Sequence, residues 1–268
     1  MTVFRSTGFP RAMPELLLVI GNRDAFNEVS RQLKISRQYP VHGFIELKIA
    51  EHSGKEIALV SAPQLPQITA SIIEESAIAG SRTVIKIGTA YSVSHSLSIG
   101  EILVPKAAVR LERVSDFFAP VELPALPDYD LYTRMINDIG SIEIKPTQQT
   151  LSYKKPHGSP QVTSGIVASI SYMSSKYINS NNKISEIIKH PAVVAVDSDT
   201  ATLFASAYEK PVKTVSILLV EGRLSDIDPL KLVQEEEWKK KYALMKNILT
   251  QVTLRIIESL AGEDKGEK

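Results

Sequence analysis

The segment from residue 83 to 89, T-V-I-K-I-G-T, combines a strand-like apolar run with groups that could bind an anion. It carries Lys86 and ends in Gly88 and Thr89. Ligand-binding groups commonly follow the carboxyl ends of parallel strands. Lys86 would then be a cation inside a cleft. The same pattern is also typical of a lysine whose stem is buried while its ammonium reaches solvent.

A second segment, V-V-A-V-D-S-D-T-A-T-L-F from residue 193 to 204, places two carboxylates where an apolar strand meets a helix. Asp197 and Asp199 stand two positions apart. Carboxylate oxygens at this spacing could accept hydrogen bonds from the paired hydroxyls of a sugar. Either aspartate could instead be the N-cap of the helix. The residues alone leave both interpretations open.

Several common catalytic motifs are absent from the sequence. The five histidines are scattered, no H-x-x-x-H or H-E-x-x-H is present, and there is no cysteine. A metal site is therefore not expected. The chain also has no G-x-G-x-x-G, no P-loop and no G-x-S-x-G, which removes the signatures of dinucleotide-binding enzymes, P-loop NTPases and serine hydrolases.

Alternating strand-length and helix-length segments must position these groups. Short apolar runs rich in β-branched residues predict strands, and apolar residues at helical spacing between them predict helices. The alternation predicts an α/β fold with one domain over residues 1–268. The predicted strands span residues 16–20, 44–50, 57–62, 83–89, 101–104, 107–111, 162–169, 193–197 and 212–220.

The helical segments have recognisable starts and faces. Asp24 is a plausible N-cap for a helix that runs to residue 33. The other predicted helices lie around residues 68–77, 198–208 and 229–261. Proline-rich stretches predict loops at residues 119–127 and 154–160, and the polar tail 262–268 is expected to fray.

Composition sets further limits on the class of protein. The 268 residues carry a formal net charge of +1 and are 43% hydrophobic, so a nucleic acid or an anionic membrane is not an expected partner. The longest apolar runs, 16–20 and 215–220, are far shorter than the ~20 residues of a membrane span. The first residues lack the apolar core of a signal peptide. We therefore expect a cytoplasmic protein.

Four segments share their order and spacing with one known family. They are I-K-I-G-T-A-Y-S (85–92), I-G-E-I-L-V-P-K-A-A-V-R-L-E (99–112), F-F-A-P-V-E-L-P-A-L-P-D (117–128) and V-D-S-D-T-A-T-L-F (196–204). In these segments the chain resembles the nucleoside phosphorylase family, which includes uridine phosphorylase, purine nucleoside phosphorylase and related nucleosidases. The resemblance runs from about residue 15 to 225.

The resemblance implies a fold and a reaction. The fold would be a three-layer α/β/α domain whose mixed central sheet bends toward a barrel, assembled as dimers or a hexamer. The reaction would be phosphorolysis, in which phosphate and base exchange at ribose C1′ through an oxocarbenium-like state. Such a site needs cations for phosphate, acceptors for sugar hydroxyls and donors for the departing base. Phosphate would be the co-substrate, and no metal or cofactor is implied.

Carried over position by position, the resemblance assigns phosphate binding to Gly21, Lys86 and Thr89. Lys86 stands where the family has an arginine, so the charge is kept but the two-pronged geometry that matches phosphate is lost. The position of another phosphate arginine holds Ala25. The arginine that a neighbouring protomer contributes would fall near residues 42–43, where there is none.

The resemblance implies a ribose site formed by Arg5, Asp197, Ser198 and Asp199. Asp199, which is also implied to be catalytic, replaces a glutamate and is one methylene shorter. Arg5 aligns with a histidine that reaches into a partner's sugar site. A carboxylate can still accept hydroxyl hydrogen bonds, but the shorter stem reaches a different place.

The base site is implied to contain Tyr91, Met173, Glu221 and Arg223, with Arg223 also catalytic. Tyr91 replaces a glycine and would fill part of the pocket or stack on a ligand. Glu221 and Arg223 could equally be solvated loop residues. The family's glycine-rich loop reads P-Q-L-P-Q-I here, residues 63–68.

These departures leave three functions open. The resemblance favours a nucleoside phosphorylase-type pentosyltransferase of altered specificity, with Arg5, Arg23 or Arg82 supplying the missing positive charge. A hydrolytic nucleosidase would use water in place of phosphate, with Asp197 or Asp199 polarising it. The third alternative is a non-catalytic homologue that binds a ligand or serves assembly.

Overall fold

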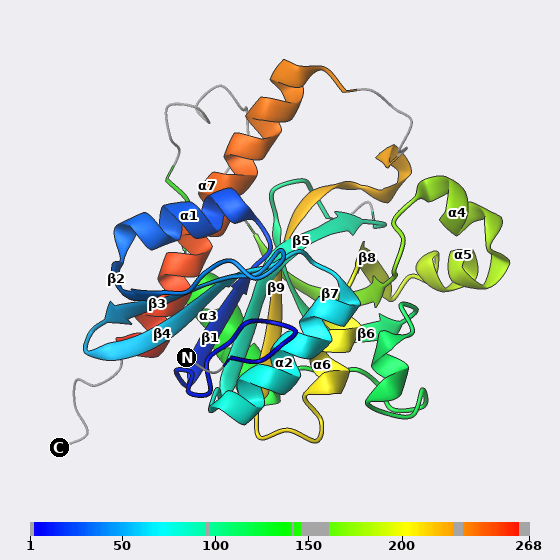
Figure 1. Ribbon diagram of the computed structural model, residues 1–268. Helices are drawn as coiled ribbons and strands as arrows, with labels where there is room; N and C mark the ends of the chain where they lie inside the picture. The colour runs from blue at the N-terminus through cyan, green and yellow to red at the C-terminus, as the bar shows by residue number, and fades with distance from the viewer. Residues whose placement is uncertain (1–2, 95–96, 141, 146–160, 228–232, 263–268) are drawn as a thin grey trace.

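The computed structural model describes residues 3–94, 97–140, 142–145, 161–227 and 233–262 (Figure 1). One nine-stranded sheet organises them. In chain order its strands are β1 (Leu16–Ile20), β2 (Lys34–Gln38), β3 (Glu46–His52), β4 (Lys55–Ser61), β5 (Thr83–Ser92), β6 (Ile102–Arg110), β7 (Val162–Ser169), β8 (Val193–Asp197) and β9 (Lys213–Arg223).

The sheet is mixed and closes on itself. Its strand order is β2-β3-β4-β1-β5-β8-β7-β6-β9, and a further pairing joins β5 to β9. Five strands, β5, β8, β7, β6 and β9, therefore form a barrel, from which β1, β4, β3 and β2 extend as an open wing. This confirms the predicted α/β fold with a sheet bent toward a barrel.

The strand β5 is the junction between barrel and wing. It runs parallel to β1 on one side and to β9 on the other, with Lys86 in register with Val19 and Ser216. A parallel strand covered on both faces is expected to be almost continuously apolar. The lysine at position 86 is therefore an exception that the surroundings must compensate.

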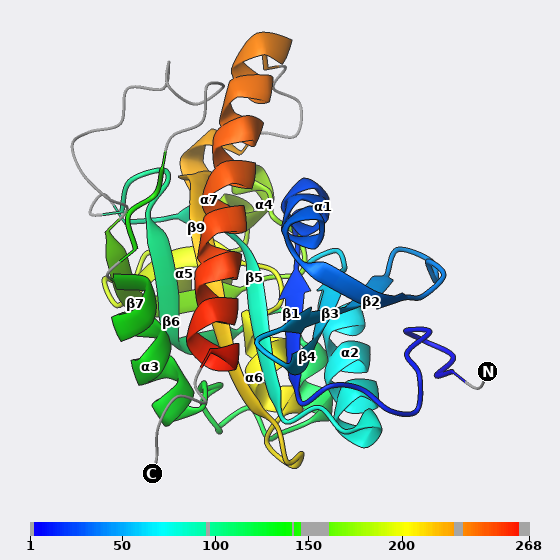
Figure 2. The same ribbon diagram turned by 90° about the vertical axis from the view of Figure 1, so that its left-hand side faces the viewer.

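Helices cover both faces of the sheet (Figures 1 and 2). The helices α2 (Pro66–Ala79) and α6 (Thr200–Ser206) pack on one face around Ile73 and Phe204. On the other face lie α1 (Arg23–Gln32), α3 (Tyr129–Gly140) and α7 (Glu235–Ala261). Two short helices, α4 (Ser175–Ser180) and α5 (Asn182–Ile188), pack with a third apolar cluster beside β8.

The predicted elements agree with the structure in most places. The runs 101–104 and 107–111 form one strand, β6. The polar strand β2 and the helices α3, α4 and α5 were not predicted. The predicted cap of α1 is wrong, because Asn22 and not Asp24 accepts the Ala25 N–H, at 2.8 Å. The predicted loop 154–160 and all but the first residue of the predicted tail lie outside the described residues.

The last helix, α7, has two different halves. Its second half is buried against the sheet, with Ile248, Val252 and Ile256 almost fully covered. Its first turns are largely exposed and project beyond the sheet, as Figure 2 shows for the orange part of the ribbon. Among the described residues no helix is both long and apolar enough to cross a membrane.

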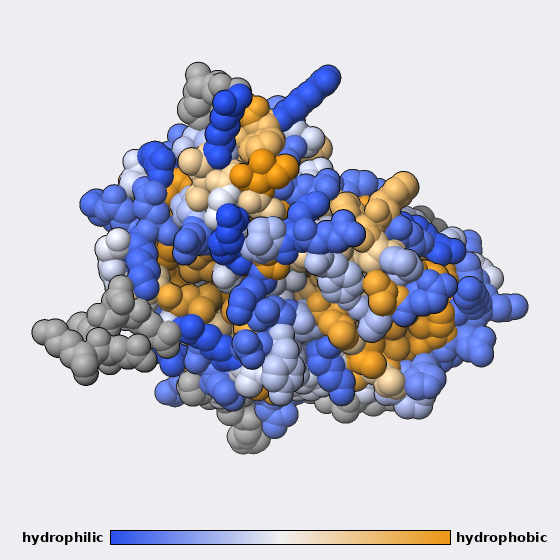
Figure 3. All heavy atoms as spheres, turned by 90° about the horizontal axis from the view of Figure 1, so that it is seen from below, coloured by the Kyte–Doolittle hydropathy of each residue, from blue (hydrophilic) through white to orange (hydrophobic). Residues whose placement is uncertain are grey.

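Apolar side chains also lie on the surface. Figure 3 shows several apolar areas on the face seen from below. The exposed apolar side chains include Phe117, Val121 and Leu123, in the segment that follows β6, and Phe44, in the β2–β3 connection.

Candidate functional site

Strand alternation directs Lys86 into the layer between the sheet and the helices α2 and α6. Its neighbours of the same parity, Val84 and Ala90, pack in that layer, and successive side chains of a strand alternate between faces. Two acids approach the same layer from another direction, since Asp197 ends β8 and Asp199 directly precedes α6.

These three residues form a buried ionic cluster. Lys86 Nζ lies 2.8 Å from Asp197 Oδ2 and also donates to Asp199 Oδ1. Lys86 is 2% exposed, Asp197 0% and Asp199 1%. Fully ionised, one ammonium and two carboxylates leave the cluster with a net charge of −1. The alternative of a lysine that reaches solvent is therefore wrong.

Hydroxyl and amide groups satisfy the remaining oxygens of the ionic cluster. Ser169 Oγ donates to Asp197 Oδ1 at 2.6 Å, and the Thr200 N–H donates to Asp197 Oδ2 at 3.0 Å. Thr69 Oγ1 donates to Asp199 Oδ2 at 2.5 Å. All four carboxylate oxygens thus have a donor, as buried charges require. Asp199 is the N-cap residue of α6, but its side chain makes no cap hydrogen bond, and the Asp197 side chain accepts the first amide of the helix instead.

The protonation equilibria of the ionic cluster follow from its surroundings. Burial by itself lowers the pKa of Lys86, but the attraction of the two aspartates outweighs burial and raises that pKa. Burial raises the pKa of Asp197, yet Lys86 and the hydrogen bonds from Ser169 and Thr200 bring that pKa below its ordinary value. The pKa of Asp199 is raised by burial and by the charge of Asp197, which together exceed the effect of Lys86.

A cavity of about 500 Å³, the strand-end cavity, lies where the carboxyl ends of β1, β5 and β9 face the first half of α7. On the sheet side the cavity is lined by Gly21, which follows β1, by Thr89 and Tyr91 of β5, and by Glu221 of β9. The opposite wall of the cavity comes from α7, which contributes Trp238, Lys241, Tyr242 and Met245. No member of the ionic cluster lines this cavity.

The walls of the strand-end cavity are aromatic and charged. The rings of Trp238 and Tyr242 stack with centroids 4.9 Å apart and an interplanar angle of 14°. Across from them, the ring of Tyr91 lies against Gly222, where an added Cβ would be 3.2 Å from the ring and 3.6 Å from Lys241 Nζ. Burial, together with the nearby Glu221 carboxylate, raises the pKa of Tyr91.

Gln64 lies between the strand-end cavity and the ionic cluster. Its Oε1 accepts the Thr89 N–H at 3.0 Å, and its Nε2 donates to Thr89 Oγ1 at 3.2 Å. An added Cβ at Gly88 would lie 2.1 Å from Gln64 Oε1 and 3.3 Å from Lys86 Cε. The carboxamide and the lysine stem therefore both lie over Gly88.

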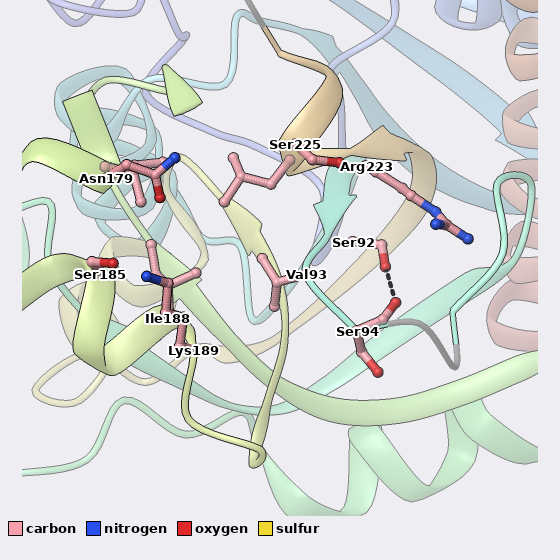
Figure 4. Close-up of a pocket in the computed structure, with 11 residues that line it drawn as sticks. Ser92, Val93, Ser94, Asn179, Ser185, Ile188, Lys189, Arg223 and Ser225 are labelled. Atoms are coloured by element: carbon pink, nitrogen blue, oxygen red, sulfur yellow. Dashed lines mark hydrogen bonds between the residues drawn. The ribbon is translucent and has the colours of Figure 1, made fainter. Parts of the chain in front are cut away.

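A second, smaller cavity of about 240 Å³ lies on the side of α4 and α5 (Figure 4). It is lined by Ser92, Asn179 and Arg223 among others. Figure 4 shows the Arg223 side chain pointing away from Asn179 and Ile188. Arg223 does not line the strand-end cavity.

Comparison with known proteins places this architecture in a family. The family model described as the phosphorylase superfamily matches residues 15–258. The chain belongs to this superfamily.

Relatives with known names are similar over part of the chain. Uridine phosphorylase of Escherichia coli K12 is 30% identical over 127 residues, which are 47% of this chain and 50% of the relative. Uridine phosphorylase of Thermococcus kodakarensis is 26% identical over 51% of this chain and 49% of its own length. Guanosine phosphorylase of Halorubrum lacusprofundi is 25% identical over 65% of this chain and 64% of its own length. The chain spans about half the length of the uridine phosphorylases.

A solved structure of uridine phosphorylase from Vibrio fischeri ES114 is similar over almost the whole chain. Its TM-score is 0.75, with 16% identity, and the match covers 97% of this chain and 98% of that one. That structure holds 6-hydroxy-1-naphthoic acid. At this identity the likeness shows that the superfamily fold is shared.

The structure brings the predicted site residues of this superfamily member into two groups. Lys86, Asp197 and Asp199, which the sequence assigned to phosphate and ribose, meet in the ionic cluster. The predicted residues that line the strand-end cavity are Gly21, Thr89, Tyr91 and Glu221.

Other predicted residues lie elsewhere. Arg5 is exposed in the N-terminal segment, and Ser198 is half-buried beside the ionic cluster; neither lines either cavity. Met173 packs against the third apolar cluster, and Arg223 lines the smaller cavity.

Of the cations considered as compensation, only Arg23 lines the strand-end cavity, where it donates to Glu46 at 2.9 Å. Arg82 sits at the opposite end of β5 and donates to the carbonyls of Ala77 and Ser81.

Sequence reasoning missed the wall that α7 contributes and the role of Gln64. Trp238, Lys241 and Tyr242 fall in the predicted helix 229–261, and the sequence predicted no role for them in the site. The signal for Gln64 was present, because the segment 63–68 lacks the glycines of the family's loop. Within the described ranges, no group of three His, Cys, Asp or Glu side chains could hold a metal ion.

Proposed function

We propose that this superfamily member binds a nucleoside in the strand-end cavity without cleaving it by phosphorolysis. The alternative of a non-catalytic, ligand-binding homologue thus fits the site better than the enzyme that the resemblance implies. The observation that carries the proposal is the state of Lys86. Its ammonium, in the position of a phosphate-binding arginine, is buried between two carboxylates.

Phosphate binding to Lys86 would be costly. A phosphate would have to separate Lys86 from Asp197 and Asp199, and removing one partner of a buried ion pair costs about 3–5 kcal/mol. The phosphate would also lie beside the remaining negative charge. No other cation replaces the missing arginines at the expected positions, since Ala25 is fully buried and residues 42–43 are His-Gly.

The strand-end cavity itself suits a nucleoside. Its volume of about 500 Å³ falls in the range of small-molecule sites. Trp238 and Tyr91 offer aromatic faces to a base, and Glu221 and Lys241 offer an acceptor and a donor to hydroxyl or base edges. The named relatives are uridine and guanosine phosphorylases, which supports a nucleoside as the ligand.

Intrinsic fluorescence tests the proposal directly, because Trp238 is the only tryptophan in the chain and lines the cavity. Uridine and guanosine are titrated with and without inorganic phosphate, and free base is assayed in the same samples. We expect saturable fluorescence changes that phosphate does not alter, and no free base.

The other functions give different results in this experiment. Release of base only with phosphate would establish phosphorolysis, for which the meeting of Lys86, Asp197 and Asp199 is the favouring observation. Base release without phosphate would establish a nucleosidase. Neither release nor fluorescence change, together with an unchanged melting temperature, would leave a structural role.

Self-association as dimers or a hexamer is part of the proposal. Phe44, Phe117 and Val121 are exposed apolar side chains that assembly would cover. Light scattering coupled to size exclusion measures the mass in solution, and a monomer would contradict this part.

A further inference from the structure

Gln64 makes one of the contacts that a bound oxyanion would make, because its Oε1 accepts the Thr89 backbone N–H, and its Nε2 donates to Thr89 Oγ1 at 3.2 Å. A phosphate oxygen is an acceptor of the same kind and would bind both Thr89 groups as donors. The carboxamide therefore satisfies the Thr89 N–H internally and occupies the hydroxyl with a donor of its own, so neither group is open to an anion.

The fold makes room for this side chain. An added Cβ at Gly21 would lie 2.9 Å from Gln64 Cγ, and one at Gly88 would lie 2.1 Å from Gln64 Oε1. Both distances are shorter than real Cβ contacts, so only glycine is compatible with Gln64 in this position. The glycines at the end of β1 and in β5 thus leave the space that Gln64, in the segment before α2, occupies.

We propose that Gln64 is a specificity-determining residue that occupies an oxyanion position of the strand-end cavity and thereby restricts the cavity to neutral ligands. Removing its side chain would expose the Thr89 N–H and hydroxyl. The opened space would lie beside Arg23 and the first turn of α1, whose amides favour negative charge. This inference rests on the proposed function in one respect only, namely that the neutral ligand of the cavity is a nucleoside.

The test compares inorganic phosphate binding among variants. In Gln64→Ala the anion position is open, whereas Gln64→Glu keeps the position filled and adds a negative charge. Gln67→Ala, at an exposed glutamine three positions away, is the matched control. Phosphate is titrated while Trp238 fluorescence and melting temperature are recorded.

We expect Gln64→Ala to bind phosphate at least about tenfold more tightly than the wild type, as one added charged hydrogen bond would provide. Gln64→Glu and Gln67→Ala are expected to match the wild type. Equal phosphate affinity in wild type and Gln64→Ala, with a native circular dichroism spectrum, would overturn the inference. A gain in Gln64→Glu equal to that in Gln64→Ala would overturn it too.

Gln64→Ser guards against a variant that does not fold, because it opens the same space with a small polar side chain. The result of the phosphate titration does not depend on whether the cavity binds a nucleoside. Failure of nucleosides to change wild-type fluorescence would contradict nucleoside binding, whereas failure of phosphate to bind the opened variants would contradict the role of Gln64 alone.

Discussion

The ionic cluster and the strand-end cavity lie on either side of Gln64 and use charge in opposite ways. In the ionic cluster, Lys86 pairs with both Asp197 and Asp199 inside the core, and every carboxylate oxygen has a donor. In the strand-end cavity, Lys241 forms no ion pair with any described residue and faces open volume. The charges that the resemblance assigns to phosphate and ribose thus pair with one another in the core, whereas charged and aromatic side chains of α7 line the cavity.

The largest effect that this contrast predicts is on stability. Lys86→Met leaves two buried carboxylates without their cation and is expected to lower the free energy of unfolding by about 3–5 kcal/mol. Urea denaturation measures the loss. Lys106→Met, at an exposed lysine, is expected to change it by no more than about 0.5 kcal/mol. If the two variants were equally stable, the cluster would not hold the fold together.

Substituting the two aspartates of the ionic cluster should cost different amounts of stability, and the two losses should depend differently on pH. Asp197→Asn is expected to cost about 1.5–3 kcal/mol at neutral pH, since it weakens charged hydrogen bonds from Lys86, Ser169 and Thr200. Because the folded-state pKa of Asp197 is lowered, its stabilisation is present above the unfolded pKa and is lost as pH falls through the folded pKa. The difference between wild type and Asp197→Asn should therefore shrink in acid.

Asp199 has a raised folded-state pKa, so its contribution is present in acid and is lost as pH rises through that pKa. At neutral pH, Asp199→Asn is therefore expected to cost less than Asp197→Asn. Urea denaturation of both variants across acidic and neutral pH measures this, and a larger loss in Asp199→Asn at neutral pH would contradict the assignment.

Nucleoside affinity should change on substitutions in the strand-end cavity and not on substitutions in the ionic cluster. Trp238→Ala removes a stacking surface and is expected to weaken nucleoside binding by about 1–3 kcal/mol, which is roughly five- to a hundredfold. Calorimetry measures the affinity, because the variant has lost its fluorophore. Tyr129→Ala, at an exposed aromatic outside the cavity, is the control. Unchanged affinity in Trp238→Ala would remove α7 from the binding site.

The smallest expected effect comes from an ion pair on the surface. In the open wing, Arg37 Nη2 of β2 lies 2.6 Å from Glu56 Oε2 of β4, and about half of each side chain is exposed. Arg37→Ala is expected to change the free energy of unfolding by about 0–1 kcal/mol, and added salt should reduce even that. A loss as large as that in Lys86→Met would remove the distinction between buried and exposed pairs.

The core of the fold was predictable from sequence because its strands are apolar. The strand β2 was missed because K-I-S-R-Q lies at the edge of the sheet and is mostly exposed, so no alternation marks it. The helix α3 was missed although Leu131, Met135 and Ile139 form a helical stripe. The resemblance implied a sheet bent toward a barrel, but the pairing of β5 with β9 that closes the barrel is not contained in any local pattern.

For the site, sequence identified the groups but not their partners. The spacing of Lys86, Asp197 and Asp199 says nothing about whether they meet each other or a ligand, because that depends on how α6 docks on β5. The position of Gln64 likewise depends on tertiary contacts with Gly21 and Gly88.

The division of α7 has a consequence for dynamics. The helix of 27 residues is about 40 Å long, and only its second half is anchored in the core. A molecule lodged against Trp238 and Tyr242 would tether the projecting turns to the sheet, so their amide hydrogens should exchange more slowly with deuterium when the cavity is filled. Occupancy could thus be read from the outer turns of one helix, even where no bond is broken.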